Sequence, residues 1–192
     1  DASSRFSKDT RCGLFPALAL GWKIDNMAFM KDASSINDLK LRLGWGVTGQ
    51  QDIGDYYPYL AMYQQATQGS YYPVVDADGK VQYVPTLYPG AYNKDIKWEE
   101  TTTWNAGVDV AFLNNRITAS LDWYLRETKD LLAYVTVPIG SATSNEMTIN
   151  VGSMKNIGLE FAINARPIVT KDFTWTIDYN VAWNKNEITK LN

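Results

Sequence analysis

The residues whose types and spacing could support chemistry are few, and most of them are carboxylates. Residues 76–79 (DADG) begin like a calcium-binding loop, but the twelfth position counted from Asp76 is Leu87 and not the glutamate that completes such a loop. This segment is therefore predicted to be a hairpin turn. Glu99 and Glu100 are adjacent, so on a strand they point to opposite faces and make a poor carboxylate pair for a glycosidase.

The composition excludes several other kinds of site. The sequence contains no histidine, which removes Ser-His-Asp catalysis and His-ligated metals, and its single cysteine, Cys12, cannot form an internal disulfide. A net charge of −3 without a basic patch argues against nucleic acid as a partner. We therefore expect no enzymatic activity, no metal and no cofactor. No apolar run approaches the ~18 residues of a membrane-spanning helix.

Tyrosines provide a possible binding surface. Nine of the twelve lie between residues 49 and 97, a stretch that lacks sustained periodicity and includes one possible small hairpin at 72–84. Tyrosine rings present amphipathic surfaces with few rotatable bonds, which suits stacking on sugars or packing against a partner protein. Packing of the loop against itself is the alternative. The nine residues are Tyr56, Tyr57, Tyr59, Tyr63, Tyr71, Tyr72, Tyr83, Tyr88 and Tyr92.

Six segments that could position these groups alternate apolar and polar residues with a period of two, which is typical of β-strands with two different faces. Most are about ten residues long, roughly twice a usual soluble strand and about the length that a tilted strand needs to cross a bilayer. Long loops are expected at 49–97 and 130–156 and short turns at 114–115 and 167–172. The predicted strands are 14–24, 39–48, 102–113, 116–127, 157–166 and 173–184.

Charge separates sharply between the two faces of these strands. The alternate positions that form the apolar faces of the six segments number 31 and include no charged residue. The chain-wide charged fraction of 20% would place about six there. The opposite phases contain the charges and are expected to line a polar lumen, either helping a substrate to pass or only solvating the wall. The residues expected to line the lumen are Arg42, Asp109, Asp122, Glu160 and Asp178.

The placement of aromatic residues distinguishes a membrane barrel from a soluble sandwich. If the shorter connections share one rim, the apolar phase has aromatics near both rims and mainly aliphatic residues between them, as membrane interfaces select. The two expected belts are Trp45, Trp104, Trp123 and Trp183 at one rim, and Trp22, Phe112 and Trp175 at the other. The pattern predicts an all-β, antiparallel transmembrane β-barrel wall. The alternative is a soluble β-sandwich that binds carbohydrate through exposed tyrosines.

Short motifs along nearly the whole chain resemble one family, the SusC/RagA type of TonB-dependent outer-membrane transporter. Each motif is weak alone, but their order and spacing together are fairly specific. They are residues 39–50 (LKLRLGWGVTGQ), 95–99 (DIKWE), 113–116 (LNNR), 128–132 (TKDLL), 150–160 (NVGSMKNIGLE) and 184–188 (NKNEI).

The resemblance implies a 22-stranded barrel with an N-terminal plug in the outer membrane of a Gram-negative bacterium. It also implies a SusD-like surface lipoprotein as lid, TonB as energy source, and oligosaccharides or peptides as substrates. A plug and a TonB-contacting segment are not found in residues 1–192, so the chain is expected to be an internal segment of the barrel wall. Its two edge strands should then pair with other parts of the barrel, since open edges are costly in lipid.

Overall fold

The computed structural model describes residues 1–30, 35–54, 56–65, 71–138 and 146–191. Parts of the predicted loops, namely 55, 66–70 and 139–145, lie outside the described residues. The chain divides into two compact units, considered separately below. The sheet unit comprises residues 14–50, 100–131 and 152–192, and the loop unit comprises residues 1–13, 51–99 and 132–151.

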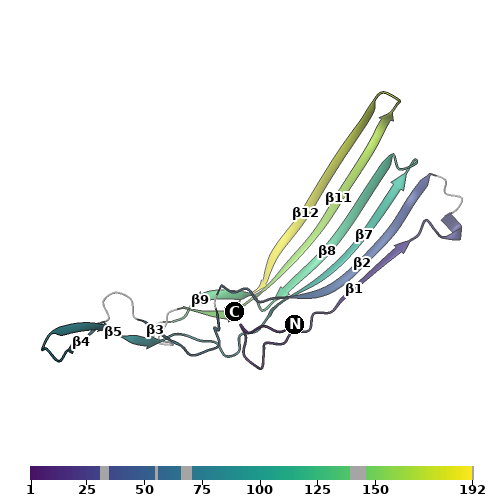
Figure 1. The fold of residues 1–192 in the computed structure, drawn as a ribbon. Helices are drawn as coiled ribbons and strands as arrows, with labels where there is room; N and C mark the ends of the chain where they lie inside the picture. The colour runs from purple at the N-terminus through teal and green to yellow at the C-terminus, as the bar shows by residue number, and fades with distance from the viewer. Residues whose placement is uncertain (31–34, 55, 66–70, 139–145, 192) are drawn as a thin grey trace. The chain divides into compact units, whose positions relative to one another are not determined.

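The sheet unit is built around one antiparallel sheet of six long strands, which lie side by side in Figure 1. The strand order is β1-β2-β7-β8-β11-β12. Alternating side chains favour this arrangement because every strand can place its apolar residues on one face of the sheet and its polar residues on the other. The prediction of an antiparallel all-β fold is confirmed. The strands are β1 (Ala17–Lys23), β2 (Ile36–Gln50), β7 (Glu99–Phe112), β8 (Ile117–Lys129), β11 (Ser153–Val169) and β12 (Thr174–Lys190).

Several strand ends differ from the bounds expected from sequence. β1 begins at Ala17 and not at residue 14, because Pro16 lacks an N–H, although its carbonyl still accepts a bond of 2.9 Å from the Val47 amide. β11 continues through Pro167 with a register shift between Ala165 and Ile168, so the turn expected at 167–172 starts later. A β-bulge is one of the few places where a strand accommodates proline.

β12 extends six residues beyond the expected end at 184, to Lys190. The apolar alternation ends at Trp183, but the backbone pairing with β11 continues to Ser153. Backbone hydrogen bonds thus extend the strand where side-chain hydrophobicity no longer marks it.

The turn between β7 and β8 is wider than the two-residue Asn114-Asn115 turn expected. Leu113, Asn114 and Asn115 all have positive φ (52°, 56° and 60°), a conformation that asparagine tolerates well. The Asn37 side-chain oxygen accepts a bond of 2.6 Å from the Asn114 amide, and Arg166 donates to the Asn115 carbonyl at 2.6 Å. Side chains from β2 and β11 therefore stabilise this turn.

Within its own unit, the described part of the sheet forms a single layer. Among the described residues of that unit other than glycine, only Ala111 and Thr128 are buried, and large apolar side chains of all six strands are exposed. β1 pairs only with β2, and β12 only with β11, among the described residues. The sheet has two unpaired edges and no second layer, unlike the sandwich that was the alternative.

The loop unit has a small core that joins two segments distant in sequence. Phe6 is 1% exposed, Ile96 0% and Trp98 7%, and the rings of Phe6 and Trp98 lie 5.2 Å apart. The indole N–H of Trp98 donates to the Arg11 carbonyl at 3.1 Å. Phe6 lies in a mostly polar and charged stretch, residues 1–12, and its burial makes this stretch part of the core.

Short strands complete the loop unit as three separate pairs. The β4–β5 hairpin ends in a turn whose Asp76 side chain accepts bonds from the amides of Asp78 (3.0 Å) and Lys80 (2.9 Å), while Gly79 has φ of +78°. The expected hairpin turn is therefore present. The pairs are β3 (Tyr63–Gln65) with β6 (Leu87–Pro89), β4 (Tyr71–Val75) with β5 (Val81–Pro85), and β9 (Leu132–Thr136) with β10 (Glu146–Asn150).

An ion pair attaches the N-terminal segment to the start of the long tyrosine-rich stretch. Arg5 donates to a carboxylate oxygen of Asp52 at 2.7 Å, and this bond, with a second from the Gly54 amide, lowers the pKa of Asp52. One helical element is described in the chain, the 3-10 turn η1 (Ala28–Met30). No helix among the described residues is long and apolar enough to span a membrane.

Candidate functional surfaces of the sheet and loops

An ion-paired cluster occupies the middle of the polar face, the side of the sheet that carries the predicted lumen residues. Arg42 of β2 donates to both carboxylate oxygens of Asp109 on β7, at 2.7 and 2.9 Å. The same Nη2 atom that donates to Asp109 also lies 2.9 Å from Oδ1 of Asp122 on β8. The two-pronged geometry suits guanidinium and carboxylate, and each side chain remains about one third exposed. Because solvent reaches all three side chains, the ion pairs contribute little to the free energy of unfolding.

Gly107 leaves the space in which this cluster sits. A Cβ built on Gly107 would meet a carboxylate oxygen of Asp122, its register partner on β8, and would lie 2.8 Å from the outer nitrogen of Arg42. Any side chain at 107 would therefore displace the guanidinium or the carboxylate. The absence of a side chain here lets Arg42 cross β7 and reach both acids.

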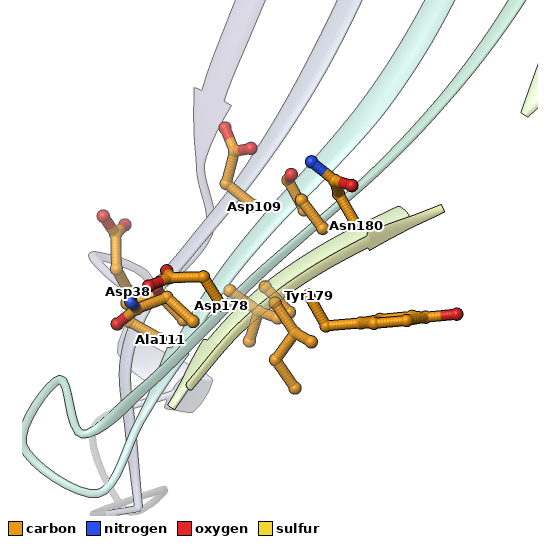
Figure 2. Close-up of a pocket in the computed structure, with 13 residues that line it drawn as sticks. Asp38, Asp109, Ala111, Asp178, Tyr179 and Asn180 are labelled. Carbon is orange, nitrogen blue, oxygen red and sulfur yellow. Dashed lines mark hydrogen bonds between the residues drawn. The ribbon is translucent and has the colours of Figure 1, made fainter. Parts of the chain in front are cut away.

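A hollow of about 410 Å³ lies on the polar face nearer the short turns. Asp109 and Asp178 line it together with Asn164, Asn180 and Asp38, a residue that sequence reasoning did not select. Asn164 donates to Asp178 across the β11–β12 pair. Figure 2 shows the Asp109 and Asn180 side chains pointing to one side and the Tyr179 ring pointing away. Carboxylates, amides and hydroxyls in such a hollow can hydrogen-bond polar solutes.

Glu160 lies beside the cluster and not within it. It is the register partner of Asp122 on the neighbouring strand, and both line a second hollow with Ser120 and Asn180. Arg42 faces two carboxylates, and Glu160 adds a third beside Asp122, so the middle of the polar face is net acidic. The like charges of Asp122 and Glu160 on adjacent strands also repel each other. The structure thus brings Arg42, Asp109 and Asp122 together and places Glu160 and Asp178 around them.

The opposite, apolar face gathers its tryptophans into rows. Trp123 of β8 and Trp183 of β12 share a row through Leu159, their common register partner on β11. The rings of Trp45 and Trp104 lie 5.9 Å apart on β2 and β7. Trp45 and Trp104 lie towards the ends of β2 and β7 that are away from the β7–β8 turn, whereas Trp123 is the middle residue of β8 and Trp183 lies near the middle of β12. The strands extend further beyond the tryptophans than the sequence predicted.

The second expected belt lies near the β7–β8 and β11–β12 turns. Phe112 pairs with Ile117 beside the β7–β8 turn, and Trp175 pairs with Ile168 beside the β11–β12 turn. Trp22 of β1 pairs with Leu41. Between the two belts, one row across four strands reads Val108, Leu121, Phe161 and Val181.

Seven of the nine loop tyrosines are exposed, while Tyr59 and Tyr88 are half-buried. Tyr72 and Tyr83 belong to the β4–β5 hairpin and are 68% and 70% exposed. The Tyr57 and Tyr59 rings meet edge to face at 6.3 Å, and Arg5 lies over the Tyr56 ring at 5.1 Å. The loop unit therefore packs some of these rings against itself and presents others to solvent.

Sequence reasoning missed the partners that give these surfaces their geometry. The period of two placed Arg42 on the same face as the acids, but strand register was needed to pair it with Asp109 and Asp122. A glycine facing charged residues, as Gly107 does, was the available signal. No cluster of three metal-ligating side chains occurs among the described residues.

The single-layered antiparallel sheet, with one apolar face and one charged face, is typical of a segment of a transmembrane β-barrel wall. A family model described as TonB dependent receptor-like, beta-barrel, matches residues 1–191. The chain belongs to the TonB-dependent receptor family and is of the SusC/RagA type, a transport family and not a family of enzymes.

Individual relatives agree with this assignment. The TonB-dependent receptor SusC of Bacteroides thetaiotaomicron is 56% identical over 191 residues, which cover 100% of this chain and 18% of that receptor. The TonB-dependent receptor P39 of Formosa agariphila is 39% identical over the same length, 17% of its own. The solved structure of the RagAB peptide transporter matches with a TM-score of 0.82 and 29% identity, covering 99% of this chain and 20% of that one. The chain thus spans about a fifth of the length of these relatives.

Proposed function

We propose that the chain forms part of the wall of an outer-membrane importer in a Gram-negative bacterium. With a SusD-like surface lipoprotein as its partner, the importer takes up oligosaccharides or peptides. TonB energises it through segments outside these residues. The observation that carries the proposal is the charge separation across one layer of strands. A face without charges between two aromatic belts suits lipid, and a face with Arg42, Asp109 and Asp122 suits a water-filled lumen.

The 56% sequence identity to SusC and the structural similarity to the RagAB peptide transporter support import as the activity. The polar face adds a chemical constraint on what passes. Its net acidic middle would repel an anionic solute, whereas hydroxyl-rich or cationic solutes can hydrogen-bond to its carboxylates and amides. Both oligosaccharides and peptides meet this requirement.

Spin labels at residues 121 and 122 of the full-length transporter test the assignment of faces. In lipid vesicles, the label at 121 should be relaxed by lipid-soluble oxygen, and the label at 122 by a water-soluble nickel complex. Leu121 and Asp122 are adjacent, so depth in the membrane is nearly the same and only the face differs. The reverse pattern would show that the faces are assigned wrongly.

The long connections between strands are proposed to be extracellular and the short turns periplasmic, as in other outer-membrane barrels. An epitope tag at Gly79, whose added Cβ would meet nothing within 4 Å, should be accessible to antibody on whole cells. A tag at Asn115, in the β7–β8 turn, should become accessible only after the outer membrane is permeabilised. Labelling of Asn115 alone on intact cells would contradict this orientation.

The exposed loop tyrosines are proposed to contact the substrate or the lid lipoprotein. Replacing Tyr72 and Tyr83 together with alanine should weaken substrate binding or co-purification of the lid, because both side chains are exposed and can pack on another surface. Replacing the half-buried Tyr59 and Tyr88 is the matched control, which should instead destabilise the loop unit. Unchanged substrate affinity and unchanged lid recovery after the Tyr72/Tyr83 change would exclude this role.

A further inference from the structure

Residues from three of the short sequence motifs meet in the loop unit. Leu132 and Asn150 are register partners at one end of the β9–β10 pair, and both bond to the segment that leads into β7. The Leu132 amide donates to a carboxylate oxygen of Glu99 at 2.9 Å. The proposed transport function does not account for this meeting. The motifs are residues 95–99 (DIKWE), 128–132 (TKDLL) and 150–160 (NVGSMKNIGLE).

The carboxamide of Asn150 binds the backbone of Lys97 as a neighbouring strand would. Its Oδ1 accepts a hydrogen bond of 2.9 Å from the Lys97 amide, and its Nδ2 donates to the Lys97 carbonyl at 2.8 Å. Residues 96–98 lie outside the described strands, so one side chain satisfies two backbone groups that a β-ladder would otherwise satisfy. Through this bond and the one to Glu99, both strands of the β9–β10 pair hold the same segment.

The N-terminal residues of the chain hold this segment at the intervening positions. The Thr10 hydroxyl donates to the Ile96 carbonyl at 2.7 Å, and the Trp98 indole donates to the Arg11 carbonyl at 3.1 Å. Ile96 and Trp98 are buried, whereas Lys97 between them is exposed. This alternation is that of an extended segment with two sides. Its even-numbered residues contact the N-terminal residues, and its odd-numbered residues contact the β9–β10 pair.

Asn93 attaches the tyrosine-rich stretch to the same segment. Its amide donates to the Pro58 carbonyl at 2.8 Å, and its side chain donates to the Thr148 carbonyl of β10 at 3.3 Å. Its side-chain oxygen accepts a bond of 3.1 Å from the Asp95 amide. We call residues 93–99 the strap. The three parts of the loop unit that meet on it are residues 1–13, 51–92 and 132–151.

The buried apolar side chains of the loop unit are gathered at the strap. Among the described residues of that unit, the large apolar side chains that are buried are Phe6, Ile96 and Trp98. Two of these belong to the strap, and the Phe6 ring packs on Trp98. A segment whose burial depends on a shared element opens together with that element.

We propose that the strap is a conformational latch, and that the three parts of the loop unit order and open together as one cooperative body while it is bound. Asn150 is the positioning residue that closes the latch, because it alone supplies both hydrogen bonds to the Lys97 backbone described above. Binding of any partner to one part, including the exposed tyrosines, would then also stabilise the other two.

Amide hydrogen exchange of the full-length transporter in detergent, resolved by mass spectrometry, tests the latch without any ligand. Asn150→Ala removes both bonds to Lys97 and should favour opening about thirtyfold, the usual effect of two hydrogen bonds. The Ser3 and Arg11 amides are bonded at 3.0 and 2.9 Å within the N-terminal segment. In one cooperative body, these amides should exchange faster by the same factor as those of β10.

The matched control is Gln82→Ala, which removes a carboxamide that donates to Asp76 at 3.2 Å within the β4–β5 hairpin. It should leave exchange in the N-terminal segment and in β10 unchanged. Asn150→Asp keeps the size of the side chain but replaces its donor by an acceptor, so it should accelerate exchange at least as much as Asn150→Ala. The reciprocal variant Trp98→Ala should accelerate exchange in β10.

Independent opening of the parts would overturn the proposal. It would appear as faster exchange confined to residues 132–151 after Asn150→Ala and confined to residues 1–13 after Trp98→Ala. If Asn150→Ala did not reach the outer membrane, Thr10→Val would replace it, since it removes only the hydroxyl that bonds to the Ile96 carbonyl. Thr10→Val should accelerate exchange in β10 about fivefold, and unchanged exchange there would equally overturn the latch.

Discussion

A lysine in place of Leu121 would put a charge in the middle of the apolar face. Leu121 is 44% exposed, and its register partners Val108 and Phe161 offer no hydrogen-bond acceptor on their side chains. In the barrel this exposed surface would face lipid. Lysine at the midplane of a β-barrel destabilises it by about 2–4 kcal/mol. We therefore expect Leu121→Lys to lower the folding equilibrium constant by about 30- to 700-fold, since 1.4 kcal/mol is tenfold.

The matched control is Ser120→Lys, one residue earlier on the same strand. Ser120 is on the polar face, and its register partner on β7 is Asp109, which can accept a hydrogen bond from a lysine. The same charge at nearly the same depth should therefore change stability little, with the added attraction to the acid offsetting the loss of side-chain entropy.

Denaturant unfolding of the full-length transporter in lipid vesicles, followed by tryptophan fluorescence, measures both variants. Leu121→Lys should shift the midpoint to clearly lower denaturant, and Ser120→Lys should not. Leu121→Ala is a further control, because it removes the packing of the side chain without adding a charge. If Ser120→Lys were as damaging as Leu121→Lys, the two faces would not differ in polarity and the reasoning would be refuted.

Two further substitutions test interactions that register and packing create. Gly107→Ala should displace Arg42 and destabilise the barrel by about 1 kcal/mol in the same unfolding assay. The control is Gly21→Ala, whose Cβ would meet only a Lys40 side-chain carbon at 3.5 Å and which should leave stability unchanged. Equal denaturation midpoints for the two variants would show that the ion-paired cluster relaxes freely. Trp98→Ala removes a side chain that is only 7% exposed and should destabilise the loop unit by about 3–5 kcal/mol. The measurement is amide hydrogen exchange, which should become faster in residues 1–13. An unchanged exchange rate would mean that this core does not hold the segment.

The environments of residues in the loop unit were harder to predict from sequence than those of strand residues. Phe6 reads as one aromatic in a charged stretch, yet it packs against Trp98, which is 92 residues away in the chain. Contacts of this range have no local periodicity. For the same reason the sequence could not separate the tyrosines that pack within the loop from those that remain exposed.

The sequence by itself determined the strands and their two faces. Successive side chains in a strand point to opposite sides, so the alternation around Leu121 and Asp122 assigns one residue to each face without knowledge of any neighbouring strand. The positions of tryptophan along each strand indicated the membrane belts in the same local way. An all-β wall with one apolar and one charged face followed from these two patterns.

The tertiary structure decided which residues of different strands meet. Register brings Arg42 to Asp109 and Asp122 and makes Gly107 the gap between them. These relations depend on how far each strand is shifted along its neighbour, a quantity set by backbone hydrogen bonds between distant segments. The alternation of a single strand looks the same after any shift of two residues, so it cannot distinguish one register from another. Only the pairing of strands in the assembled sheet selects the register.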